Sequence, residues 1–140
     1  MPFTIHDEGE GLHVVLTGFA APYEFLEIAQ ATAAHPGRDR HKYELFDFTD
    51  IDSDSLFALT ETIGAGHAAK SREIFGDREN PKFTGLISPH AKMQDVFAAF
   101  ISGKPRPDGH ETEAFTSLKA ARAWLAVRLA ADPDAGKASS

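Results

Sequence analysis

The spacing of apolar residues switches along the chain between a period of two and a period of about 3.6, which is typical of alternating strands and helices. Residues 2–8 and 12–19 are short β-prone runs separated by Gly9, Glu10 and Gly11, so we predict an opening hairpin. In the second run the apolar residues share one face: Leu12, Val14 and Leu16.

The rest of the chain continues this alternation. Helix formers stop at Pro36-Gly37, and an aromatic run that reads as a central strand follows. Later runs carry apolar residues three and four positions apart, as helices covering a core do. The expected elements are helix 21–35, strand 43–48, helix 56–74, strand 82–88, helix 93–101, edge strand 111–117 and helix 118–130.

The pattern ββαβαβαβα predicts one α/β domain over residues 1–130, with a mixed, mostly parallel sheet and helices on both faces. Residues 131–140 contain too few apolar groups to order themselves, so we predict a disordered tail. Ligands of such sheets gather at the carboxyl ends of the strands, here residues 49–55 and 88–90.

Composition narrows the function classes. The formal charge of -7 argues against a nucleic-acid partner, and the absence of cysteine excludes disulfides and thiolate chemistry. The seven histidines are dispersed without a zinc-binding spacing, so the sequence predicts no metal site and no cofactor. No apolar stretch is long enough for a membrane span or a leader, and we expect a soluble, cytoplasmic protein without membrane insertion.

The segment after the central strand is rich in acids and hydroxyls. Asp52, Ser53 or Asp54 can cap the helix that follows, because the first turn of a helix leaves backbone N–H groups unpaired and carries partial positive charge. A capped strand-to-helix junction needs no further function.

The element order, the strand YELFDFTDID and the closing EAFTSLKAARAWLAVRL resemble the SpoIIAA-like proteins, whose fold is shared by STAS domains and by the lipid-binding lobe of CRAL-TRIO (Sec14-like) proteins. The resemblance covers residues 3–130. It implies a small bacterial α/β module without established catalysis, used for binding or regulation.

In anti-sigma-factor antagonists of that fold, a phosphorylated serine lies at the matching helix start. The resemblance therefore points to Ser53 and Ser55 as phosphorylation candidates, although Asp54 interrupts the serine pair and no glycine follows. We expect the module to contact a protein partner, or a second copy in a homodimer, through the 49–55 loop and the helix after it. The predicted partner-binding residues are Asp50, Asp52, Ser53, Asp54, Ser55 and Phe57.

Two alternatives come from other functional classes. The Sec14-like side of the resemblance suggests a carrier of a small apolar ligand or lipid, with a pocket lined by Leu59, Ile63, Val96, Phe97 and Phe100. A hydrolase at the strand ends would use Ser88, His90 and Asp47, although the chain has no Gly-x-Ser-x-Gly elbow.

A calcium loop is disfavoured. Asp50, Asp52, Asp54 and Glu61 have the spacing of EF-hand ligands, but Ser55 replaces the glycine that the turn needs.

Overall fold

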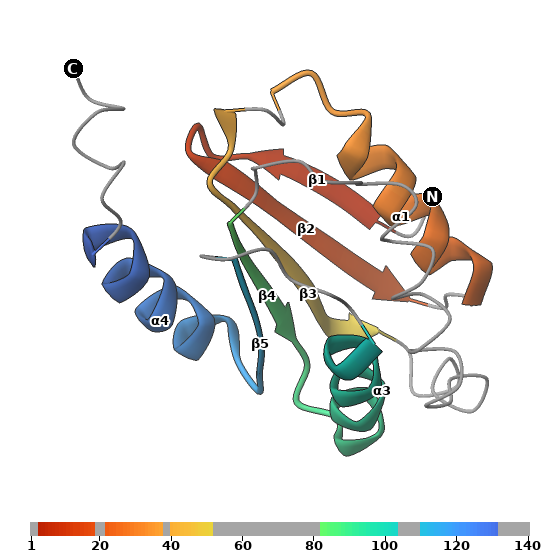
Figure 1. The fold of residues 1–140 in the computed structure, drawn as a ribbon. Coiled ribbons are helices and arrows are strands. Elements are labelled where there is room, and N and C mark those ends of the chain that lie inside the picture. Colours follow the sequence, from red (N-terminus) through yellow and green to blue (C-terminus); the bar gives the residue numbers. More distant parts are fainter. Residues whose placement is uncertain (1–2, 19–21, 38–39, 52–81, 104–109, 132–140) are drawn as a thin grey trace.

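The computed structural model describes residues 3–18, 22–37, 40–51, 82–103 and 110–131 (Figure 1). Within these ranges the chain forms five strands and three helices. They are β1 (Phe3–Asp7), β2 (Gly11–Gly18), α1 (Pro22–Ala33), β3 (Tyr43–Ile51), β4 (Phe83–Ile87), α3 (Ala91–Gly103), β5 (Glu111–Phe115) and α4 (Leu118–Ala131).

The five strands form one sheet in the order β1-β2-β3-β4-β5. β1 pairs with β2 in the antiparallel sense, and the other three pairings are parallel. The predicted α/β class, the mixed and mostly parallel sheet and the opening hairpin are therefore confirmed. β1 and β5 are the two edges of the sheet, and the edge position predicted for residues 111–117 is confirmed.

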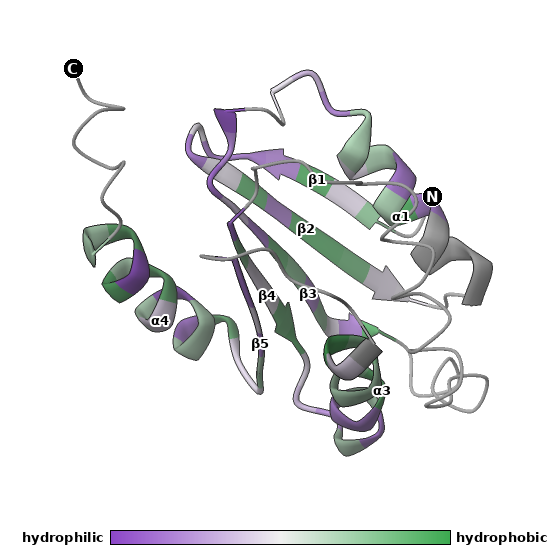
Figure 2. Cartoon of the chain, viewed as in Figure 1, coloured by the Kyte–Doolittle hydropathy of each residue, from purple (hydrophilic) through white to green (hydrophobic). Residues whose placement is uncertain are grey.

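The hairpin turn depends on its glycine. Gly9 has a φ of 87°, in the left-handed region that residues with a side chain rarely adopt. The turn closes because the N–H of Glu8 donates to the carbonyl of Gly11 at 2.8 Å, and the N–H of Gly9 donates to Asp7 Oδ1 at 2.8 Å. Figure 2 shows this turn as hydrophilic, in contrast to long hydrophobic stretches of β2 and β4.

Apolar side chains pack on both faces of the sheet, and the helices divide between the faces (Figure 1). The core between the sheet and the helices α1 and α3 is formed by Leu12, Val14, Leu16, Ile28, Phe48, Ile51, Leu86, Met93, Val96 and Phe97. The core between the sheet and α4 is formed by Tyr43, Leu45, Phe83, Ile87, Ala121 and Leu125. The expected placing of helices on both faces is confirmed, and so are the apolar stripes expected for α3 and α4.

Element ends differ by a few residues from those predicted. α1 ends at Ala33, two residues before the predicted end, and β3 continues three residues beyond Phe48. The early end of α1 follows from Pro36, because proline disfavours helical backbone at the residue before it. The N–H of His35 bonds instead to the carbonyl of Thr32, at 3.2 Å, in a tightened last turn.

Two predicted elements fall outside the described residues: the helix at 56–74 and, from residue 132, the tail. Residue Ala131, which we had assigned to the tail, is the last residue of α4. Among the described helices, none is long and apolar enough to cross a membrane.

Candidate functional site

The carboxyl end of β3 contains a bulge. Val15 pairs with Asp47 and Thr17 pairs with Asp50, so two steps along β2 correspond to three along β3. An extra residue of this kind changes which face the following side chains take. As a result Phe48 and Ile51 both enter the core under α1 and α3, although three positions separate them.

The bulge explains why the prediction of the strand end was wrong. The alternation of core residues breaks after Phe48, and we interpreted that break as the start of a loop. The structure keeps residues 49–51 in the strand, with Thr49 and Asp50 exposed and Ile51 buried. The predicted 49–55 loop therefore begins inside β3.

Asp47 organises the bulge with both carboxylate oxygens. Its Oδ1 accepts hydrogen bonds from the backbone N–H of Thr49 at 3.1 Å and from the Thr49 hydroxyl at 2.5 Å. Its Oδ2 lies 3.3 Å from Nε2 of His13 on β2. The Asp47 side chain is largely buried, so these partners are what satisfies its oxygens.

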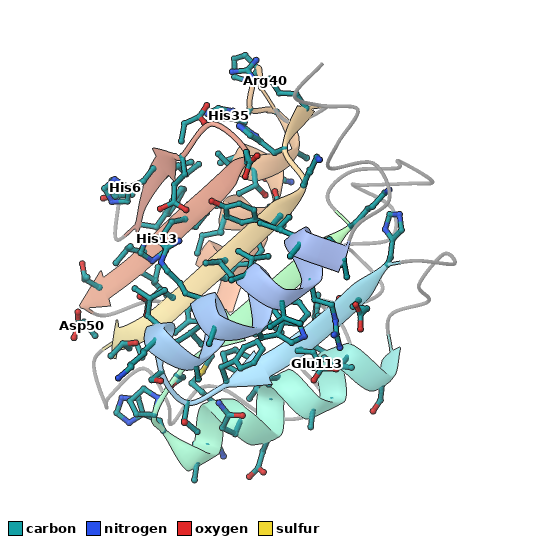
Figure 3. All side chains as sticks on the ribbon, turned by 90° about the vertical axis from the view of Figure 1, so that its left-hand side faces the viewer. His6, His13, His35, Arg40, Asp50 and Glu113 are labelled. Carbon is teal, nitrogen blue, oxygen red and sulfur yellow. The ribbon has the colours of Figure 1, made fainter. Side chains whose placement is uncertain are left out.

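The polar end of β3 adjoins a part of the sheet that α4 does not cover. α4 packs on β4 and β5. In Figure 3, which views this face, His6, His13 and Asp50 lie beside α4, and the rings of His6 and His13 are 5.9 Å apart between centroids. Within the described part of the chain, the exposed Thr49 and Asp50 thus stand at the carboxyl edge of a parallel sheet, where ligands usually bind.

The predicted site residues are only partly described. Of the partner-binding set, Asp50 is the member that the structure describes, and it is exposed. The remaining members and both phosphorylation candidates lie outside the described residues: Asp52, Ser53, Asp54, Ser55 and Phe57. They stay predictions.

Those residues of the predicted ligand pocket that the structure describes are packed in the core. Val96 and Phe97 are buried, and the Phe97 ring lies 5.5 Å from that of Phe48. Phe100 is partly buried against the same cluster. Leu59 and Ile63 lie outside the described residues, so the pocket as a whole stays a prediction.

The suggested hydrolase residues do lie at one edge of the sheet, because Asp47 pairs with Ile87, next to Ser88. However, the Asp47 carboxylate contacts His13 and Thr49. The Ser88 hydroxyl accepts a hydrogen bond from the backbone N–H of His90 at 3.2 Å. No contact described here supports the catalytic arrangement, which stays a prediction.

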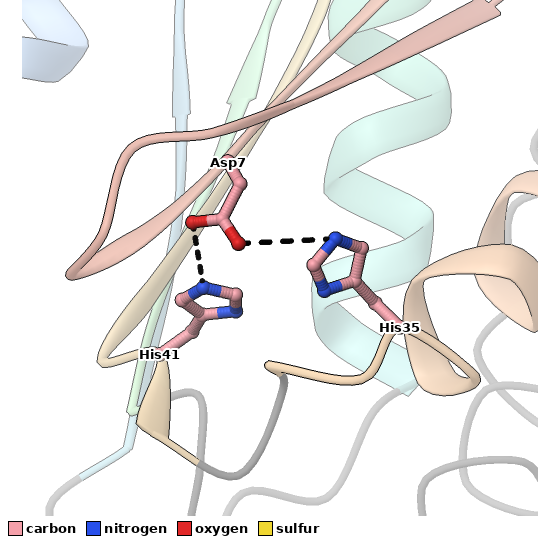
Figure 4. Close-up of side chains that lie close together, drawn as sticks. All are labelled: Asp7, His35 and His41. Carbon is pink, nitrogen blue, oxygen red and sulfur yellow. Dashed lines mark hydrogen bonds and ion pairs between the residues drawn. The ribbon is translucent and has the colours of Figure 1, made fainter.

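A second polar cluster lies at the other end of the sheet and was not foreseen. Figure 4 shows Asp7 between His35 and His41. His41 Nε2 is 3.0 Å from Asp7 Oδ1, and His35 Nε2 is 3.9 Å from Asp7 Oδ2. No sequence pattern indicates this cluster, because 34 positions separate Asp7 from His41 and only the fold brings them together.

Comparisons with protein-family models, with curated proteins and with solved structures found no match to this chain.

Proposed function

We propose that this chain is a non-catalytic binding or regulatory module of the SpoIIAA-like type, which contacts a protein partner or a second copy through the end of β3 and the segment that follows. The order of elements in the described residues is compatible with this type. The resemblance itself rests on the sequence.

The observation that carries the proposal is the bulge at the end of β3. Bulges of this kind often re-aim side chains next to functional sites. Here the bulge leaves Thr49 and Asp50 exposed while their neighbours Phe48 and Ile51 stay in the core. Asp47 holds the bulge through two hydrogen bonds to Thr49, so the exposed pair sits on a fixed backbone rather than on a free loop.

The chemistry at this edge favours recognition over catalysis. Asp47, the buried acid there, has its oxygens occupied by Thr49 and His13. A partner would instead meet the exposed carboxylate of Asp50, which suits a basic or hydrogen-bond-donating surface.

The proposal is tested by reversing one charge. Asp50→Lys should remove a partner, or the self-association, that the wild-type protein shows in affinity purification from its native cells and in sedimentation. Glu113→Lys is the matched control, because Glu113 is also an exposed acid but lies on β5 at the far edge of the sheet (Figure 3). Circular dichroism verifies that both variants fold. An unchanged partner profile and oligomeric state in Asp50→Lys would contradict the proposal.

Native and denatured mass spectrometry of the same preparation separates the other predictions. A covalent phosphate mapped to Ser53 or Ser55 would support a phosphorylation switch. A bound apolar molecule would instead support the carrier.

A further inference from the structure

Three side chains able to bind metal meet where β1 ends and β3 begins. Asp7 is the last residue of β1, His35 follows α1, and His41 precedes β3. One ligand atom from each lies within 4.8 Å of the other two. In Figure 3, His35 lies at the opposite end of the sheet from Asp50, so this cluster is separate from the site proposed above. We refer to Asp7, His35 and His41 as the Asp7 cluster.

Asp7 uses its two oxygens differently. Oδ1 accepts the backbone N–H of Gly9 at 2.8 Å and faces His41 Nε2 at 3.0 Å. Oδ2 has longer neighbours, His35 Nε2 at 3.9 Å and Arg40 Nη2 at 3.8 Å. The Gly9 bond, followed by the nearby histidines, lowers the pKa of Asp7, while partial desolvation acts in the opposite direction. Oδ2 is therefore a charged oxygen with coordinating capacity left.

His41 is the strongest reason to look for a ligand. Its side chain is 0% exposed, and its Nδ1 is buried with no hydrogen-bond partner. Nε2, on the other side of the ring from Nδ1, is the nitrogen that faces Asp7 and the rest of the cluster. Figure 4 shows the Asp7 carboxylate joined by dashed lines to Nε2 of His41 and to Nε2 of His35, and the two ring centroids are 5.4 Å apart.

We propose that the Asp7 cluster binds a divalent transition-metal cation of the zinc class, through His41 Nε2, His35 Nε2 and an oxygen of Asp7. Two imidazoles and a carboxylate form a donor set that such ions prefer, and three protein ligands leave a further position for water. The cation takes the place of the proton between His41 Nε2 and Asp7 Oδ1.

Two further contacts of the metal-free protein compete with the cation. The N–H of Gly37 donates to His35 Nδ1 at 3.1 Å, so coordination through Nε2 moves the proton of the neutral ring to Nδ1 and releases this bond. The guanidinium of Arg40, 68% exposed, carries a positive charge beside Oδ2 and can turn into solvent. The neighbouring Glu8 is occupied by Arg122 and does not add charge to the site. These contacts weaken binding, and they make it adjustable by mutation.

The test is a titration of the full chain with Zn²⁺ against a chromogenic chelator, at about pH 7.5, where histidine is mostly neutral. We expect one equivalent to bind. His35→Gln and Asp7→Asn should each lower the affinity by at least about tenfold. Arg40→Gln should raise it, because a repulsive charge is removed. His6→Gln is the matched control and should leave it unchanged, since His6 is an exposed histidine of the same strand as Asp7.

His41 is fully buried, and substituting it could unfold the protein, so its role is tested by spectroscopy of the wild type. Long-range ¹H–¹⁵N spectra should show Nε2 of His41 protonated in the metal-free protein, and unprotonated with a shifted resonance after addition of Zn²⁺. Zn²⁺ should also raise the melting temperature of the wild type and of His6→Gln, but not that of folded His35→Gln. The absence of stoichiometric binding, or equal affinity in His35→Gln and wild type, would overturn the proposal.

Discussion

The carboxylate of Glu8, in the hairpin turn, receives both terminal nitrogens of Arg122 on α4, at 3.0 and 2.7 Å. These residues are 114 positions apart. The same Glu8 also accepts the hydroxyl of Tyr43 at 2.6 Å. Burial and the Glu8 hydrogen bond raise the pKa of Tyr43, and Glu8 likewise raises the pKa of Arg122. The three side chains thus connect the hairpin, the central strand and the last helix.

Removing the Arg122 side chain should destabilise the protein modestly. The pair is partly exposed, at 40% for Arg122 and 26% for Glu8, so solvent screens much of its attraction. We expect Arg122→Ala to lower the free energy of unfolding by about 0.5–1 kcal/mol, measured by urea denaturation. Lys119→Ala on the same helix is the control and should have a smaller effect, because Lys119 is exposed. Equal losses in the two variants would show that the Glu8 contact adds nothing.

The stability of the protein should fall in acid partly through Glu8. The hydrogen bond from Arg122 lowers the pKa of Glu8 below its ordinary value of 4.5, against the opposing effect of burial. A carboxyl with a lowered folded pKa stabilises the fold above the unfolded pKa and loses that contribution as pH falls through the folded pKa. Between the two values the unfolded chain binds more protons.

We therefore expect the stability difference between wild type and Glu8→Gln, measured in urea, to be largest near neutral pH and to shrink below about pH 4.5. Glu113→Gln, an exposed acid of β5, serves as the control. A difference between wild type and Glu8→Gln that did not change with pH would contradict this account.

Truncating Asp47 should release the bulge at the end of β3. Asp47→Ala removes the acceptor for two bonds from Thr49 and leaves the largely buried His13 ring without its partner. We expect a loss of about 1–3 kcal/mol in urea denaturation. Asp50→Ala, an exposed neighbour, should change the free energy of unfolding by less than about 0.5 kcal/mol. Similar small effects in both variants would mean that Asp47 does not hold the bulge.

Truncating Phe97 distinguishes a packed core from an open ligand pocket. Phe97 is 3% exposed and packs on Phe48, so Phe97→Ala should cost about 3–5 kcal/mol by leaving a cavity. Phe100→Ala should cost less, because Phe100 is only partly buried. If Phe97→Ala left the stability nearly unchanged in urea denaturation, the side chain would line an open space instead, as the carrier hypothesis requires.

The sequence by itself determined the class and the core of this protein. The spacing of buried apolar residues can be read from a short stretch of sequence. In a strand every second residue is apolar, and in a helix every third or fourth residue is. Leu12, Val14 and Leu16 could be assigned to one face for this reason, and so could the stripe of α3 that includes Phe97. The opening hairpin could also be predicted from a short stretch of sequence, because its glycines permit the turn.

The tertiary structure alone decided the end of β3 and the Asp7 cluster. The bulge depends on the two hydrogen bonds that Thr49 donates to Asp47 and on pairing with β2, which the letters FDFTDI do not reveal. The meeting of Asp7 with His35 and His41 depends on how β1, α1 and β3 place their ends around one point. Hydrophobic periodicity specifies which face a residue takes, but contacts between polar residues distant in sequence arise only when the chain has folded.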